Sequence, residues 1–396
     1  MPLATGSRTQ LRYIPETTYG AIPVAGTQRN LRRTDDSLGF RTQSKTSEEI
    51  RGDRQTTDNF LVSASAEGGL NFELSYQEYD TLMAAAFQGA WSVYGTNGVG
   101  TAISSGTWTA TTFTGTSLPI TNLTVGQWVR IATTTPGGKN DGRVVQISKT
   151  VAPSSTVITF EANSALETGA AVSFSLQGSR LSNGVIQPSF SLEREHGDIT
   201  QFLAFRGMVV SKLSLSLQSG DAVTGAFDFM GKDQLISTTT QLPGAQTQSK
   251  TFDVINCVTG VGDILEGGSP LTGTYIKSMT FDIDNKLRGR DAIGYLGNVD
   301  IGAGAVGITG NLSVYFANTN LYNKFLLSTR TSLSFRMFDP SGNGYVVTLP
   351  SVKFSAGDIK AGTKDADSMV DMTYEALMDP TFMKMVFVDR VGVAAT

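Results

Sequence analysis

Two passages of this chain show the same order of features, and this repeat constrains the fold more than any other property of the sequence. Residues 207–233 and 349–379 each contain an alternating strand, a Gly-Asp turn, a second alternating strand with an aromatic residue, and a Met near its end. Earlier in the first half, residues 62–74 predict two strands joined by a turn at Gly68-Gly69. Repeated units of this size are typical of rings and arrays, so the repeat is the expected place of function.

Residues 76–88 form the clearest predicted helix. Ser75 and Glu78 have the spacing of a capping box, and Gly89 is placed to end the helix. We expect the apolar face to pack against a sheet of its own module, with a neighbouring subunit as the alternative. This face contains Tyr76, Tyr79, Met83 and Phe87.

A change of composition between residues 92 and 182 indicates an inserted domain. Thr and Ser dominate there, and short strands alternate with turns, which predicts a small all-β domain of the Ig-like or SH3-like kind. In the second half, the helix at 321–327 is followed at once by a strand at 332–338. In the first half, the corresponding strand begins only after the insertion, at residues 185–192.

The predicted fold is therefore mainly β, with two tandem sandwich- or barrel-type modules, each with a flanking α-helix, and one inserted all-β domain. We expect the N-terminal segment to be an arm that neighbouring subunits order. The predicted parts are the N-terminal arm 1–34, module A (35–91 with 183–235), the insertion 92–182, a linker 236–270, module B (271–389) and the C-terminal tail 390–396.

Composition excludes several classes of protein. The 396 residues are 17% charged and include 43 glycines, which fits a globular protein rich in strands and turns. The net charge of −4 provides no basic field for tight nucleic-acid binding. A single cysteine, Cys257, excludes an internal disulfide framework. We identify no signal peptide and no apolar run long enough for a membrane span, and we expect synthesis in a cytoplasm.

The sequence shows no set of residues with the spacing of an enzyme active site. His196 is the single histidine and lies in a predicted turn, without a recognisable triad or metal partner. The run from Gly302 to Gly307 matches G-x-G-x-x-G, but the residues after it alternate as a strand, whereas a dinucleotide site needs a helix there. We therefore expect no enzymatic activity, no cofactor and no metal.

A polar segment, residues 41–59, carries charges of both signs. A solvated loop is the simple interpretation, and a docking loop that matches a neighbouring subunit is the alternative. Its charged residues are Arg41, Lys45, Glu48, Glu49, Arg51, Asp53, Arg54 and Asp58.

Four segments carry a resemblance to a known family: RYIPETTYG at 12–20, EIRGDRQTTDNF at 49–60, ELSYQEYDTLMAAAFQGAW at 73–91 and AFDFMGKD at 226–233. In these segments the chain resembles the major tail tube proteins of long, flexible, non-contractile tailed phages (siphophages), and in particular the members with a duplicated module. The likeness covers nearly the whole chain outside the insertion.

This resemblance implies a structural virion protein, made in the host cytoplasm. Four-stranded sheets of adjacent modules would join edge to edge around a lumen, and stacked rings would form a tail tube through which DNA is ejected into the host. Because six modules normally complete a ring, two modules per chain imply trimeric, pseudo-hexameric rings. The implied partners are further copies of the chain, the tape measure, tail terminator and distal tail proteins, and DNA in transient, non-specific passage.

The resemblance also points to two groups of site residues. For DNA to slide, the lumen should carry few cations and some carboxylates. The lumen candidates on predicted strands are Glu73, Asp228, Asp371 and Glu375, with an outer surface as the alternative place for each. Stacking between rings is expected to use the charged residues of segment 41–58 and, in the second half, Lys286, Arg288, Arg290 and Asp291.

Two other functions remain as alternatives. A tube component of a related bacterial injection system would share the fold, and neighbouring genes would separate the two. A carbohydrate-binding or adhesive surface protein is supported by Trp108 and Trp128 in the Thr/Ser-rich insertion. An adhesin needs an export signal, however, and we find none.

Overall fold

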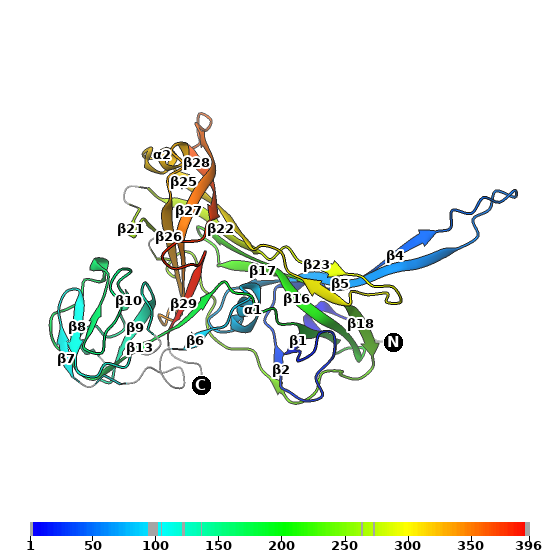
Figure 1. The fold of residues 1–396 in the computed structure, drawn as a ribbon, viewed down its shortest axis with the longest axis horizontal. Helices are drawn as coiled ribbons and strands as arrows, with labels where there is room; N and C mark the ends of the chain where they lie inside the picture. The colour runs from blue at the N-terminus through cyan, green and yellow to red at the C-terminus, as the bar shows by residue number, and fades with distance from the viewer. Residues whose placement is uncertain are drawn as a thin grey trace.

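The computed structural model describes residues 3–93, 102–103, 105–120, 123–135, 137–262, 264–271 and 274–392. These residues confirm a mainly β protein, whose helices are α1 (Asp80–Ala86), α2 (Asn320–Leu326) and two short 3-10 turns at Gly6–Arg8 and Ala162–Ser164. Figure 1 shows the small inserted domain at the lower left, the second half of the chain at the top, and a long hairpin projecting to the right.

One continuous antiparallel sheet, here called the long sheet, runs through both halves of the chain. Each strand pairs with the next through backbone hydrogen bonds, so the two halves form one structural unit. Its strands, in spatial order, are β4 (Gly39–Thr46), β5 (Asn59–Glu73), β17 (Thr224–Met230), β16 (Gln201–Gln218), β22 (Ile276–Asp284), β25 (Gly307–Tyr315), β28 (Met369–Ala376) and β27 (Gly344–Lys360).

The order of pairing in the first half recurs in the second half. In the first half, β17 lies between β5 and β16 in the long sheet. In the second half, β28 lies between β25 and β27 in the same way. The two longest strands also leave the long sheet in the same way. The first part of β16 pairs with β15 (Phe190–His196) and β18 (Asp233–Ser237), and the first part of β27 pairs with β26 (Thr331–Phe338) and β29 (Phe387–Val391).

The N-terminal segment is a strand of its own chain, which differs from the arm expected for residues 1–34. β1 (Thr9–Pro15) pairs along its whole length with β15, and it also pairs with β2 (Gln28–Asn30). Leu11 and Tyr13 are buried in the main hydrophobic core. The group of apolar residues Leu11, Tyr13 and Ile14 is therefore a strand signal, which the neighbouring Thr, Gly and Arg residues obscure in the sequence.

The predicted linker and tail also contribute strands. β19 (Gln246–Thr247) pairs with β2, and β20 (Leu265–Glu266) pairs with β21 (Ser269–Pro270) and with β26. The predicted tail at 390–396 begins inside β29, which pairs with β27 and with β14 (Ser179–Ser182). Residues 393–396 lie outside the described residues.

The inserted domain has a hydrophobic core of its own, which includes Trp108, Phe113, Ile131 and Phe174. Its ends belong to the main body instead, because β6 (Ser92–Val93) pairs with β14 and β14 pairs with β29. Two small sheets make up the domain. One contains β10 (Val144–Gln146), β9 (Trp128–Thr133) and β13 (Phe174–Gln177), and the other contains β11 (Val157–Thr159), β8 (Thr112–Gly115), β7 (Gly106–Trp108) and β12 (Gly169–Ala170).

Helix α1 begins later than the sequence predicts, and the expected capping box is absent. Its N-cap is Tyr79, which makes no side-chain cap. The carboxylate of Glu78 instead accepts backbone N–H groups from Arg32, at 3.1 Å, and from Lys250, at 2.6 Å. Glu78 therefore ties two distant segments to the turn before the helix, which is a tertiary role that local spacing does not reveal.

Both helices end with the same backbone motif. After α1, the N–H groups of Gln88 and Gly89 donate to the carbonyls of Ala85 and Ala84, both at 3.0 Å. After α2, Ser328 and Thr329 repeat these bonds to the carbonyls of Phe325 and Lys324. Gln88 and Ser328 both have positive φ, so each helix ends in a Schellman motif without glycine at the left-handed position.

Residues 62–74 do not form the predicted hairpin, because Gly68-Gly69 lies inside the single strand β5. Gly68 has a φ of +135°, and a Cβ there would come within 2.4 Å of the Ser37 carbonyl oxygen. Gly310 of β25 has the corresponding contact, since its Cβ would lie 2.1 Å from the Thr280 carbonyl oxygen. The glycines therefore allow a close approach of the neighbouring strand rather than a turn.

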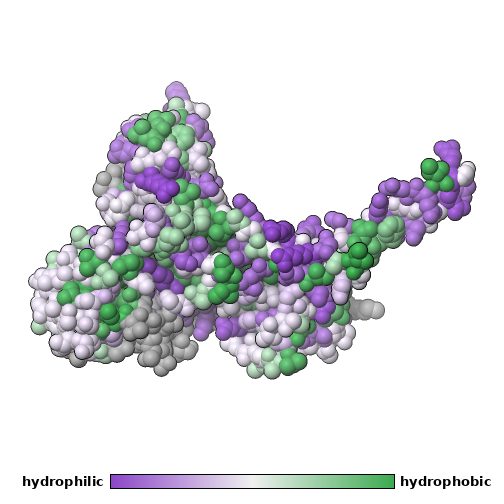
Figure 2. Space-filling model, viewed as in Figure 1, coloured by the Kyte–Doolittle hydropathy of each residue, from purple (hydrophilic) through white to green (hydrophobic). Residues whose placement is uncertain are grey.

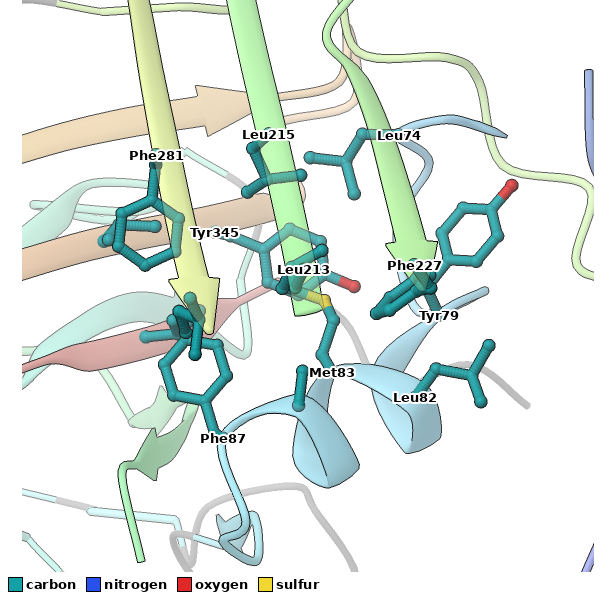
Figure 3. Close-up of a cluster of buried hydrophobic side chains, with 14 of the residues drawn as sticks. Leu74, Tyr79, Leu82, Met83, Phe87, Leu213, Leu215, Phe227, Phe281 and Tyr345 are labelled. Carbon is teal, nitrogen blue, oxygen red and sulfur yellow. The ribbon is translucent and has the colours of Figure 1, made fainter. Parts of the chain in front are cut away.

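Helix α1 packs on the inner face of the long sheet at the place where the two halves meet (Figure 3). The ring centroids of Phe87 and Phe281 of β22 are 6.4 Å apart, and those of Tyr79 and Phe72 are 4.2 Å apart. All the residues expected on the apolar face of the helix are buried, namely Tyr76, Tyr79, Met83 and Phe87. A single hydrophobic core thus continues through both halves of the chain.

Candidate functional site

The outer face of the long sheet is polar, because successive side chains of each strand point to opposite faces. In β16 the leucines 213, 215 and 217 are buried on the inner face, while Lys212, Ser214 and Ser216 face outward. The strand register places all the lumen candidates on this outer face, namely Glu73, Asp228, Asp371 and Glu375.

Carboxylates outnumber cations on this polar face. Ser214 donates to Asp282 at 2.5 Å, and Lys212 forms an ion pair with the same carboxylate at 3.3 Å. The carboxylates that the register places here are Asp35, Glu67, Glu73, Asp228, Asp282, Asp284, Asp358, Asp371 and Glu375. The cations placed here are Arg41, Lys45, Lys212, Lys353 and Lys360, and Lys277 of β22 is close enough to Asp371 to help lower its pKa. Such a face offers phosphate groups little attraction.

Two of the four candidates have shifted pKa values of opposite direction. Burial raises the pKa of Asp228, and the positive charge of Lys212 acts against this shift. The pKa of Asp371 is lowered by hydrogen bonds, first from Lys360 and then from Ser313. Asp371 is thus ionised and neutralised by its neighbour at neutral pH.

The polar segment 41–59 belongs to an extended hairpin formed by β4 and β5, which projects from the body (Figure 1). Its surface is mostly hydrophilic, as Figure 2 shows. Its charges pair with each other. Arg51 donates to both oxygens of Asp53, at 3.1 and 2.8 Å, and this bond lowers the pKa of Asp53.

Further contacts link other charged residues of the hairpin. Lys45 lies 3.2 Å from Glu48, Arg41 pairs with Glu67, and Thr57 donates to Glu49. Asp58 accepts the N–H of Asn59, and Arg54 has a positive φ at the tip. Much of the charge of the hairpin is thus neutralised by contacts within the hairpin itself.

The second charged group lies on a hairpin formed by β23 (Arg288–Arg290) and β24 (Asp300–Gly302). Arg290 forms an ion pair with Asp300 across this hairpin, and Lys286 has a positive φ at its start. Asp291 and Arg288 are exposed. The same loop contacts the base of the projecting hairpin, since the N–H of Ala64 donates to the carbonyl of Leu296 at 2.9 Å.

The features that suggested other chemistry have structural roles. Trp108 and Trp128 are 1% and 2% exposed, so neither ring can stack on a sugar. Gly302 ends β24 and Gly307 begins β25, so no helix follows the glycine run. The described residues contain no group of three or more His, Cys, Asp or Glu placed to hold a metal, and no helix among them is long and apolar enough to cross a membrane.

The structure also reveals a buried ion pair that the sequence does not signal. Arg180 donates to both carboxylate oxygens of Asp389, at 2.7 and 2.8 Å, and Asp389 also accepts the N–H of Trp128 at 3.0 Å. Arg180 further donates to the carbonyls of Val125 and Gly126 in the insertion. The pair therefore fixes the inserted domain to β29, although its members are far apart in sequence.

The described part of the chain is thus a mainly β protein with one long sheet, a polar outer face and a projecting charged hairpin. The chain belongs to the phage tail tube protein family, because the family model described as "Phage tail tube protein" matches residues 6–376. A search of curated proteins finds no match. The family identifies a structural, self-assembling protein of the virion tail.

Proposed function

We propose that this protein forms the tail tube of a siphophage as stacked rings of three chains, with six equivalent sheet modules in each ring. The recurrence of the β5–β17–β16 pairing in β25–β28–β27 carries the proposal. A chain with two such modules supplies pseudo-sixfold symmetry from three copies. The family assignment supports the tube, and the repeated pairing supports the number of chains.

In this tube the polar face of the long sheet lines the lumen. The opposite face packs on α1 and α2 and is therefore unavailable. The excess of carboxylates, with Glu73, Asp228, Asp371 and Glu375 among them, keeps DNA from adhering during ejection into the host, because phosphate contacts would slow its passage. The tape measure protein would occupy this lumen before DNA, and tail terminator and distal tail proteins would close the two ends.

The projecting hairpin makes the contacts between rings. Its mixed charges are exposed at both faces, and they can exchange their internal partners for those of a neighbouring ring without leaving an unpaired charge. The residues of the β23–β24 hairpin lie at the base of the projecting hairpin and take part in the same contact. Polar contacts of this kind allow a long tube to bend while the rings stay in register.

Electron microscopy of the purified protein tests this function. We expect hollow tubes of uniform diameter, and single rings with the mass of three 42.1 kDa chains by native mass spectrometry. Rings of six chains would contradict the duplicated module, and a monodisperse monomer under all conditions would contradict the tube.

Substitution of Arg51→Glu together with Arg54→Glu tests the stacking role. We expect isolated rings in place of tubes, because the tip of the hairpin then carries charges of one sign. The matched control is Arg143→Glu on the inserted domain, where Arg143 forms a similarly exposed ion pair with Glu167. If the double variant forms tubes of normal length, the hairpin does not take part in the contact between rings.

A further inference from the structure

The junction between the two halves of the chain shows how one module joins the next. β16 of the first half pairs with β22 of the second half, with Lys212 opposite Asp284 and Ser216 opposite Thr280. Helix α1 covers this junction from the inner side, where Phe87 packs against Phe281. The junction therefore consists of paired strands and a helix that lies across them.

The same elements are present at the two ends of the long sheet, but without a partner. Among the described residues, the last part of β27 (356–360) pairs only with β28, and β4 with the preceding β3 (Asp35–Asp36) pairs only with β5. β27 corresponds to β16 and β4 corresponds to β22. The Leu38 carbonyl on the β3–β4 edge accepts an N–H of Arg194 at 2.9 Å, and the other backbone groups along both edges are available for a further strand.

A β-bulge at the same place in each half shows which single residues of β16 and β27 correspond. Ser211 of β16 and Ser355 of β27 are the bulged residues in the pairing with β17 and β28. The hydroxyl of Ser37 accepts the N–H of Gly69 at 3.0 Å, and the hydroxyl of Thr280 accepts the N–H of Asn311 at 2.9 Å. Ser37 therefore corresponds to Thr280.

We propose that β27 of one copy pairs antiparallel with β3 and β4 of the next copy, in the register that β16 and β22 use within the chain. This places Ala356 opposite Arg41, Asp358 opposite Gly39, and Lys360 opposite Ser37. The inference rests on the proposed ring and specifies the interface between its chains. Because each copy offers both edges, head-to-tail pairing of this kind generates a ring when the rotation between copies closes.

The charges of the two edges are complementary in this register. Asp358 lies diagonally across from Arg41, and Lys360 lies diagonally across from Asp35, so each charge has an opposite one within reach. The junction inside the chain contains a diagonal pair of the same sense as Lys360 with Asp35, since Lys212 lies 3.3 Å from Asp282. A shift of one residue would move all these side chains to the wrong face.

Apolar residues that are exposed at the two edges are also brought together. Phe87 ends α1 and packs on β22, and its counterpart Leu327 ends α2 but is 76% exposed. Phe40, the counterpart of the buried Ile283, is 38% exposed. In the proposed interface, Leu327 of one copy covers Phe40 of the next, just as α1 covers the junction within the chain.

Disulfide trapping tests the register. In a Cys257→Ser background, we combine Ala356→Cys with Arg41→Cys, since Cα atoms of opposite residues in an antiparallel pair lie within the range that a disulfide bridges. The control combines Ala356→Cys with Gly39→Cys, which differs by two residues and lies too far away. After oxidation of assembled tubes, we expect covalently closed trimers from the first pair and monomers from the control.

Each outcome separates the interface from the tube itself. Tubes that form but give no covalent species with the 356–41 pair, or give it with the 356–39 pair instead, would overturn the register. Absence of tubes from the wild-type chain would overturn the proposed function before the register is tested.

The apolar contact has an independent test. Phe40→Asp should leave the melting temperature unchanged and hold the protein as a monomer in size-exclusion chromatography, because Phe40 is exposed before assembly. Val172→Asp, at a residue of the inserted domain that is 41% exposed, is the control and should assemble like the wild type. Assembly of Phe40→Asp at the wild-type concentration would contradict the interface.

Discussion

At the scale of single residues, Gly68 and Gly310 serve the long sheet in the same way. Each lies where the neighbouring strand passes too close for a side chain, opposite a Ser or Thr whose hydroxyl accepts the N–H of the next residue. Gly68 and Gly310 belong to different halves of the chain. The shared detail is a local signature of the repeat that sequence identity alone does not show.

We therefore predict that Gly68→Ala and Gly310→Ala each lower the free energy of unfolding by about 1–3 kcal/mol, because the added Cβ meets a backbone carbonyl. Urea denaturation measures this change. Gly52→Ala is the control, since nothing lies within 4 Å of a Cβ there. Equal stability of the Gly68 variant and the control would show that β3 shifts freely.

Glu78 gives a prediction on pH. Burial raises the pKa of Glu78 above its ordinary value, and the backbone N–H groups of Lys250 and Arg32 act against this shift. The folded state therefore binds this proton more tightly than the unfolded state. Protonation of Glu78 stabilises the fold fully at a pH below the ordinary pKa, and this stabilisation is lost as the pH rises through the raised pKa of the folded state.

The variant Glu78→Gln removes this titration. Relative to the wild type, its free energy of unfolding should increase from pH 4 to pH 7, whatever the constant cost of the substitution. Denaturation curves across this range measure the difference. A difference independent of pH would show that Glu78 has the same pKa in both states.

At the scale of elements, the Arg180–Asp389 pair connects the inserted domain to the rest of the chain. Burial raises the pKa of Asp389, and Arg180 opposes this shift. Replacement of Arg180 by Met leaves a carboxylate without its cation in the interior. We predict a loss of about 3–5 kcal/mol in the free energy of unfolding, as is typical when one partner of a buried pair is removed.

The matched control for this prediction is Arg143→Met, in an exposed ion pair of the same domain. A loss below about 1 kcal/mol is expected there. Thermal or urea denaturation compares the two variants, and equal losses would mean that Arg180 is not the anchor of the insertion.

The elements also show how far the sequence can predict this fold. Alternation predicts strands in both halves, and the change of composition between residues 92 and 182 predicts a separate domain there, because both signals are local. The turn at Gly68-Gly69 and the capping box at Ser75 were wrong, since the reasons for Gly68 and Glu78 lie in segments distant in sequence. The Arg180–Asp389 pair and the open edges at Phe40 and Leu327 depend on tertiary pairing, which no local pattern indicates.

At the scale of the whole molecule, the insertion is a separate unit on one of two similar halves. Val93 and Ser179 are paired neighbours in β6 and β14, so the chain enters and leaves the domain at one place. The domain is joined to the body through β6, β14 and β29, which are not strands of the long sheet, so we propose that it lies on the outside of the tube. We predict that joining Val93 to Ser179 by an Asn-Gly turn, with residues 94–178 removed, still allows assembly into tubes with a smaller outer diameter. Negative-stain images measure the diameter, and failure to form rings would give the insertion a structural role in the tube.

The β16–β22 pairing has a further consequence for the kinetics of assembly. In the proposed ring, half of the seams lie within chains and form at the effective concentration set by a tether rather than by the number of free molecules. Two encounters in solution then bring the three chains of a ring together, whereas six separate modules would need five, so fewer incomplete assemblies precede the closed ring. In the proposed ring, a chain with two modules forms half of the seams during its own folding, and only the other half depend on encounters between chains.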